Sequence, residues 1–96
     1  FTRAVVQGRT FRRPETLALM RTNVIPARHG TGKRTRDFRL GVYRPTIDGA
    51  EAWGHSGFWN TAAFHLPARD VTVAAAVLQS EAGIVMATLL RETVQA

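Results

Sequence analysis

A short stretch in the second half of the chain, Gly54-His55-Ser56-Gly57, carries the residue types best suited to chemistry. A histidine beside a hydroxyl can bind an anion or assist acyl transfer, because imidazole exchanges protons near neutral pH. The flanking glycines lack a Cβ, so the backbone there can run close to another strand or to a ligand. These residues are therefore our candidate site, and the neighbouring elements must position them.

The residues around the candidate site have the patterns of β-strands. From residue 38 to residue 43, apolar residues alternate with polar or small ones, which is typical of a half-buried strand. Asp48 and Gly49 form a turn signal. We expect the next strand over residues 51–55, carrying the candidate histidine.

The remaining part of the chain predicts two more strands and a helix. One strand is expected over residues 61–66, followed by a turn at residues 67–70. Residues 71–78 are almost wholly apolar, which predicts a strand covered on both faces. A final helix is expected over residues 82–95, with one apolar side. That side comprises Met86, Leu89, Leu90 and Val94.

The first part of the chain has helical signals followed by a polar stretch. Apolar residues at helical spacing end at Gly8, a plausible helix stop. Pro14 suits the first position of a second helix, which should finish near Thr22. Residues 1–22 are therefore expected to be helical, and residues 23–36 to form a basic loop.

Together these elements predict an α+β fold, with an antiparallel meander of three to four strands in residues 37–79 and a C-terminal helix packed on it. One terminal helix cannot cover both faces of such a sheet. We therefore expect a further helical layer, encoded before Phe1, and treat residues 1–96 as one segment of a larger domain. An uncovered sheet face also predicts self-association.

Charge is concentrated in the first half of the chain, and the net charge is +6. Residues 1–45 hold eleven of the thirteen Lys and Arg residues, most densely at residues 28–36. Such a stretch can bind phosphates, but it lacks the interleaved aromatic residues of a single-strand platform, so a solvated loop is favoured over nucleic-acid contact. The Gly30-Thr31-Gly32-Lys33 segment is not a P-loop, because no glycine, Ser/Thr or apolar strand stands where that motif needs one.

Several other classes find no support in the sequence. There are no cysteines, so disulfide and thiolate chemistry are excluded, while the compartment is left open. No apolar run reaches the length of a membrane span. No histidine and carboxylate cluster has the spacing of metal ligands, so neither a metal nor a cofactor is expected.

The motifs taken in order resemble the C-terminal part of a β-lactamase-related or penicillin-binding-protein-like serine hydrolase. The Trp53-Gly54-His55-Ser56-Gly57 stretch resembles the third catalytic box of that family in its histidine form. The family's leucine-glycine strand is matched at Leu40-Gly41. The closing strands and helix are similar to the sequence from Leu66 onward, and the paired N-terminal helices to residues 1–22.

The resemblance implies acyl transfer to a serine, acting on an ester, a D-amino-acid peptide or a β-lactam. It implies that His55 assists proton transfer or holds a substrate carboxylate, and that the backbone N–H of Phe58 belongs to the oxyanion hole. It further implies that Ser56 and Gly57 contact the substrate. The rim of the pocket would then be shaped by Trp59 and Asn60.

The family's Ser-x-x-Lys nucleophile motif is absent from this chain, whose only serines are Ser56 and Ser80. By the resemblance, an N-terminal remainder must supply it, and this segment alone should be inert towards a small-molecule or peptide substrate. The alternative hypothesis is a non-catalytic basic domain that binds nucleic acid or another polyanion through residues 28–36.

Overall fold

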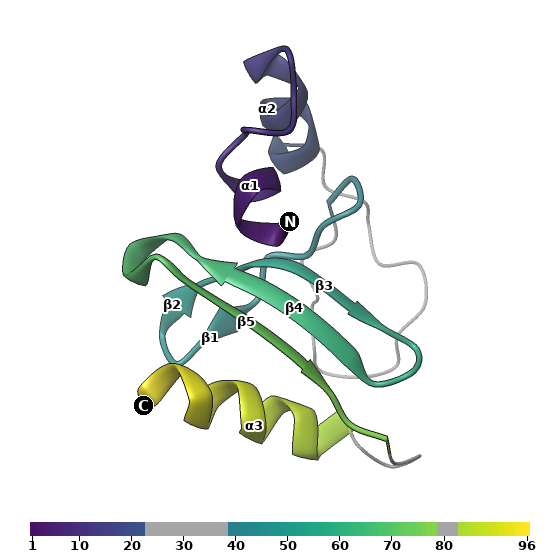
Figure 1. The fold of residues 1–96 in the computed structure, drawn as a ribbon, viewed down its shortest axis with the longest axis vertical. Helices are drawn as coiled ribbons and strands as arrows, with labels where there is room; N and C mark the ends of the chain where they lie inside the picture. The colour runs from purple at the N-terminus through teal and green to yellow at the C-terminus, as the bar shows by residue number, and fades with distance from the viewer. Residues whose placement is uncertain (23–38, 79–82) are drawn as a thin grey trace.

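The computed structural model of this chain describes residues 1–22, 39–78 and 83–96. The described residues form three α-helices, a 3-10 turn and five strands (Figure 1). The helices are α1 (Thr2–Val6), α2 (Pro14–Thr22) and α3 (Gly83–Gln95), and η1 spans Pro67–Arg69. The strands are β1 (Thr46–Ile47), β2 (Ala50–Glu51), β3 (Trp53–Gly57), β4 (Thr61–Leu66) and β5 (Val71–Ala76).

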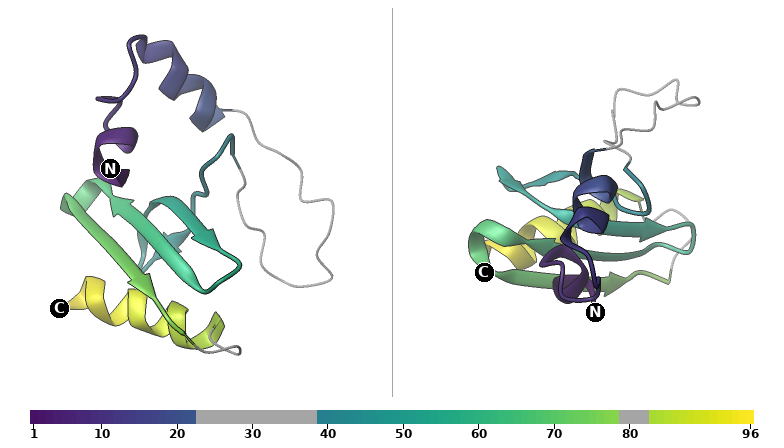
Figure 2. Two further views of the ribbon diagram at one scale, coloured as in Figure 1. Left: turned by 45° about the vertical axis from the view of Figure 1, so that its right-hand side comes forward. Right: turned by 90° about the horizontal axis from the view of Figure 1, so that it is seen from above.

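The strands form two antiparallel sheets. One is the small hairpin of β1 and β2, and the other is three-stranded, in the order β3-β4-β5. Figures 1 and 2 show α3 along one face of the larger sheet and α1 over the opposite face. The predicted α+β class, antiparallel sheet and C-terminal helix are therefore confirmed. The larger sheet has three strands, within the expected three to four, and the hairpin of β1 and β2 forms a separate sheet.

The hydrophobic core lies between the larger sheet and α3. Because side chains alternate along a strand, Phe64 and Leu66 of β4 point to the same face. Phe64 stands opposite Val73 of β5 in the register, and all three residues are at most 6% exposed. From α3, Met86 and Leu90 complete this core. Four residues apart, they lie on one side of the helix.

Both N-terminal helices occur where the sequence predicts them. The first ends before Gly8, whose φ of +76° is a left-handed conformation that favours glycine. The second begins at Pro14, whose missing N–H would have no partner in the first turn of a helix. It ends at Thr22, as expected. None of the residues of α2 is fully buried, so this helix is held at the margin of the fold.

The strand expected over residues 38–43 is wrong for the part that the structure describes, residues 39–43. There the chain turns: the N–H of Arg39 donates to the carbonyl of Val42 at 2.9 Å, and Gly41 has a φ of +72°. Only Tyr43 pairs with the larger sheet, through one bridge to Gly54. The alternating pattern did not reveal a glycine in a left-handed conformation, which bends the backbone out of a strand.

The expectation that residues 71–78 form a strand covered on both faces is also wrong. The strand β5 ends at Ala76, and within it only Val73 is buried. It is the outer strand of the larger sheet, so its alternate residues, Thr72 and Ala74, face away from α3 and are exposed. An apolar run of small residues can therefore occupy a half-covered edge strand.

The strand that carries the candidate site spans Trp53–Gly57 rather than residues 51–55, because Ala50 and Glu51 pair with β1. The expected strand over residues 61–66 has the predicted bounds. The final helix is confirmed, with one correction on its apolar side. Leu89 is 39% exposed, since it lies about 100° around the helix from Leu90.

The Asp-Gly turn signal is confirmed by the β1–β2 hairpin. Asp48 and Gly49 have φ values of 50° and 73°, the left-handed pair of a type I′ turn. The Asp48 carboxylate accepts hydrogen bonds from Gln95 at 3.0 Å and from Arg69 at 3.1 Å. The hydrogen bond from Gln95, followed by that from Arg69, lowers the pKa of Asp48 below its ordinary value.

We expect replacement of Gln95 by methionine to raise the pKa of Asp48 towards its ordinary value. The stabilising contribution of a carboxylate with a lowered pKa is complete above about pH 3.9, the unfolded value, and is lost as pH falls through the folded pKa. Side-chain NMR titration of Asp48 measures the change. Gln7→Met is the matched control, because Gln7 contacts Asp70 instead, and equal shifts in both variants would refute the assignment.

Candidate functional site

The candidate residues lie on β3 and on the turn that follows it. In the register with β4, Gly54 stands opposite Phe64 and His55 opposite Ala63. A Cβ added to Gly54 would lie 1.9 Å from the carbonyl oxygen of Ala63 and 2.8 Å from the Cα of Phe64. Gly54 therefore allows a close approach of backbone to backbone, as the sequence analysis predicts.

Among the residues that the structure describes, the outer edge of β3 is paired through one bridge, between Gly54 and Tyr43. The N–H of Tyr43 donates to the carbonyl of Gly54 at 2.6 Å, and the N–H of Gly54 donates back at 3.2 Å. In an antiparallel ladder the backbone groups of alternate residues point to the same edge. The N–H and C=O of Ser56 therefore point towards this outer edge, one step beyond the bridge, where they can receive an extended ligand.

The His55 side chain is exposed and stacks on Tyr43, with 4.3 Å between ring centroids and 29° between ring planes. Ser56 is half-buried, and its Cβ lies on the opposite face of β3, because successive residues of a strand alternate. His55 and Ser56 are thus adjacent on β3, but their side chains lie on opposite faces and only the backbone groups of Ser56 point to the outer edge.

The turn between β3 and β4 contains the other candidate residues. Asn60 has a φ of 54°, and its carbonyl accepts a hydrogen bond from the N–H of Val77 at 2.9 Å. A left-handed third residue is typical of a three-residue hairpin loop. Phe58 and Trp59 are 89% and 79% exposed, with their rings edge to face at 5.3 Å. They do not pack in the core, so they are available to a ligand or another chain.

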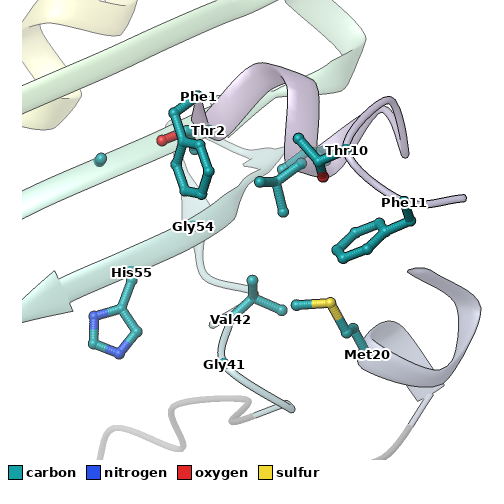
Figure 3. A pocket seen from close by; sticks show the side chains of 12 residues that line it. Phe1, Thr2, Thr10, Phe11, Met20, Gly41, Val42, Gly54 and His55 are labelled. Atoms are coloured by element: carbon teal, nitrogen blue, oxygen red, sulfur yellow. The ribbon is translucent and has the colours of Figure 1, made fainter. Parts of the chain in front are cut away.

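A pocket of about 570 Å³ lies on the α1 side of the sheet, next to His55 (Figure 3). Its walls come from α1, α2, the segment before Tyr43, and the two strands β3 and β4. Figure 3 shows Phe11 and Met20 at one end of the pocket and His55 towards the other, with Val42 between them. The sequence analysis did not find this pocket, because its walls are far apart in the chain.

Trp53 is buried, and three arginines surround its ring. The guanidinium carbons of Arg21, Arg39 and Arg44 lie 5.0, 5.9 and 5.9 Å from the ring centroid, within the range of cation–π attraction. The indole N–H donates to Glu51 at 2.6 Å. This buried tryptophan therefore has a packing role, and the three arginines form a basic cluster around it.

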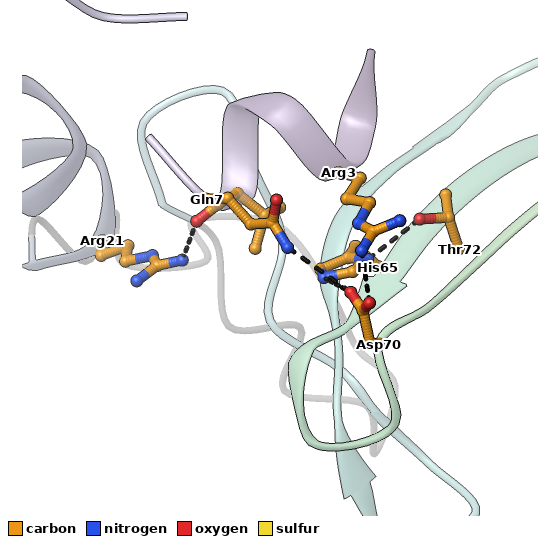
Figure 4. Close-up of polar contacts among 7 residues, drawn as sticks. Arg3, Gln7, Arg21, His65, Asp70 and Thr72 are labelled. Atoms are coloured by element: carbon orange, nitrogen blue, oxygen red, sulfur yellow. Dashed lines mark hydrogen bonds and ion pairs between the residues drawn. The ribbon is translucent and has the colours of Figure 1, made fainter. Parts of the chain in front are cut away.

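The sequence analysis assigned no site to His65, which is 1% exposed and lies on the face of β4 opposite Phe64. Its Nδ1 is hydrogen-bonded to the Thr72 hydroxyl at 2.9 Å, and its Nε2 lies 3.8 Å from the Asp70 carboxylate (Figure 4). Arg3 of α1 also donates to Asp70. A histidine inside an apolar strand is the sequence signal that could have indicated such a buried polar contact.

This second cluster positions α1 over the sheet, because Arg3 and Gln7 both bind the carboxylate that faces His65. Figure 4 shows these side chains reaching down from α1 to the loop before β5. The cluster therefore closes one side of the fold, and its geometry serves the placement of α1 rather than chemistry on a substrate.

The candidate site offers hydrogen-bond donors and an imidazole but no paired nucleophile. Within the part of the chain that the structure describes, no hydroxyl is hydrogen-bonded to His55, and no group of three or more potential metal ligands occurs. No helix of the described residues is long and apolar enough to cross a membrane. Residues 28–36, the predicted basic stretch, lie outside the described residues.

Comparison of the chain with protein-family models, curated proteins and solved structures gave no significant match. The resemblance to β-lactamase-related hydrolases accordingly stays a hypothesis that depends on the residues themselves.

We expect Gly54→Ala to destabilise the fold by at least about 3 kcal/mol, because its Cβ would collide with the backbone of β4. Gly57→Ala is the matched control on the same strand. There the Cβ would meet only the Thr61 hydroxyl, at 2.7 Å, and that side chain can rotate, so a change within about 1 kcal/mol is expected. Urea unfolding of both variants measures the difference, and equal costs would contradict this register.

Proposed function

We propose that this chain is the C-terminal part of a β-lactamase-related serine hydrolase. In this proposal it supplies the strand edge that holds the substrate, while the nucleophilic serine comes from an N-terminal remainder. The observation that carries the proposal is the outer edge of β3, where the backbone groups of Ser56 point outward beside an exposed His55.

The edge suits an acyl-transfer site because an ester or amide carbonyl needs N–H donors as its oxygen gains charge. The backbone of Ser56 can pair with an extended substrate in the manner of a neighbouring strand. Two residues after Ser56, the backbone N–H of Phe58 is the proposed donor of the oxyanion hole. One such donor typically lowers the barrier by about 2.7–4 kcal/mol.

The remaining candidates have matching places around this edge. His55 would take or return a proton beside the reacting carbonyl, or hold a carboxylate. Gly57 ends the strand without a side chain that would shield its edge. The exposed rings of Phe58 and Trp59, with Asn60 at the end of the turn, would form the rim. The N-terminal remainder of the domain is the proposed partner. When that remainder is absent, we expect the chain to self-associate instead.

A paired-chain experiment tests the proposal. We expect the parent reading frame to encode a Ser-x-x-Lys motif upstream, and the purified remainder to become labelled by a fluorophosphonate once it docks on this chain. His55→Ala should slow that labelling by about 10²-fold or more, because general acid–base groups typically contribute that much. Docking, measured by isothermal titration calorimetry, should change little.

The control for this experiment is Arg91→Ala, an exposed position on α3, which covers the opposite face of the sheet. This variant should label at the unchanged rate. The 96-residue chain alone should not label at all. Stoichiometric labelling of the isolated chain, or a His55→Ala pair that reacts at full rate, would reject the proposed role.

A second candidate function is polyanion binding, and the cluster around Trp53 is the observation that favours it. In the sequence, its three arginines lie on either side of the basic stretch of residues 28–36. Among the described residues, the carboxylate beside this cluster belongs to Glu51. Guanidinium groups gathered on one surface attract phosphates and other anions.

Under this second hypothesis, the chain should be retained on immobilised single-stranded DNA in low salt, and the double variant Arg21→Gln/Arg44→Gln should elute at lower salt. Each lost phosphate contact should reduce the slope of log affinity against log salt by about 0.7. The exposed pair Arg12→Gln/Arg13→Gln controls for net charge. Equal elution of both double variants would show that the cluster itself contributes nothing.

A further inference from the structure

The pocket beside His55 is almost free of polar groups. Among the described residues that line it, the polar side chains are Thr2, Thr10 and His55, and none is an aspartate, glutamate, lysine or arginine. A ligand that carries charge along its length would lose its hydration there without a compensating partner. The lining therefore disfavours a peptide and favours an uncharged apolar group.

The pocket is also directional. Phe11 and Met20 lie at one end and His55 lies towards the other, with Val42 between them (Figure 3). Its volume of about 570 Å³ is that of a small-molecule site, for which such sites usually span about 300–1,000 Å³. A ligand that fits this arrangement has an apolar tail and a polar head group.

The polar end coincides with the strand edge already described. His55 lines the pocket and stands next to Ser56, whose backbone groups point to the outer edge of β3. A carbonyl placed at this edge would have its attached chain beside the pocket. We propose that the pocket binds the acyl chain of a medium-chain carboxylic ester, with the tail towards Met20 and the carbonyl towards His55.

This inference rests on the proposed hydrolase function for its biological meaning, but it concerns binding alone. Its test uses the intact 96-residue chain and a series of straight-chain methyl esters, from methyl butanoate to methyl dodecanoate, each below its aqueous solubility limit. Affinity should increase about fourfold per added methylene, the equivalent of ~0.8 kcal/mol, until the pocket is full. Beyond that length the affinity should stop increasing.

The length limit is the ester chain length beyond which affinity stops increasing, and two substitutions should move it in opposite directions. Met20→Ala enlarges the apolar end, so the limit should shift to longer esters, and Val42→Phe narrows the middle, so it should shift to shorter ones. Met20 is half-buried on a helix that has no buried residue, so its truncation should leave the fold intact. Leu19→Ala, 55% exposed on the same helix, is the matched control and should leave the limit unchanged.

The orientation has its own readout by NMR. Short esters should shift the His55 ring signals and leave the Met20 methyl signal in place, whereas longer esters should shift both. A Met20 methyl that stays unmoved at saturation, or an affinity that does not depend on chain length, would overturn the inference. Binding seen only above the aqueous solubility limit would do the same, since it reports adsorption to ester droplets.

Failure of this inference is distinguishable from failure of the proposed function. If short esters acylate the serine of the docked pair with the assistance of His55, while binding to the free chain does not depend on chain length, only the acyl pocket is rejected. Length-dependent binding without acylation by the pair supports the pocket as an apolar-ligand site and rejects the hydrolase. The two experiments therefore report on separate claims.

Discussion

The burial of β4 on both of its faces is the constraint on which the described fold depends. Towards α3, Phe64 and Leu66 form the apolar core; towards α1, His65 is buried and satisfied by Thr72 and faces Asp70. A buried imidazole without partners would cost several kcal/mol, so this polar contact is as necessary as the apolar one. One six-residue strand thus presents apolar side chains on the face towards α3 and a buried polar contact on the face towards α1.

The same strand determines how the candidate site is presented. Because Gly54 has no Cβ, β3 can lie against β4 at the distance that the ladder requires. That pairing uses the backbone groups of alternate residues of β3 and leaves those of Ser56 directed to the outer edge. The chemistry proposed for this edge is therefore a consequence of strand register. His55 stands on β3 itself, and α1 and α2 supply walls of the pocket beside it.

The described surface includes apolar and small side chains that the fold leaves exposed. Thr72 and Ala74 of β5 are exposed on the face that α1 covers only in part, and the turn carries Phe58 and Trp59 in the open. Large exposed apolar side chains at one end of a small fold are typical of interaction sites. They are the part of the described surface where the proposed N-terminal remainder would dock.

The sequence by itself determined the elements that obey local rules: the helix begun by Pro14, the Asp48-Gly49 turn, the strand Thr61–Leu66, and the terminal helix. It also singled out Gly54 as a close backbone approach. Only the tertiary structure decided which strand lies at an edge of the sheet, to which edge the backbone groups of Ser56 point, and what His65 contacts. Local patterns report the period of an element and its turn residues, whereas faces, edges and pockets depend on segments that meet only after folding.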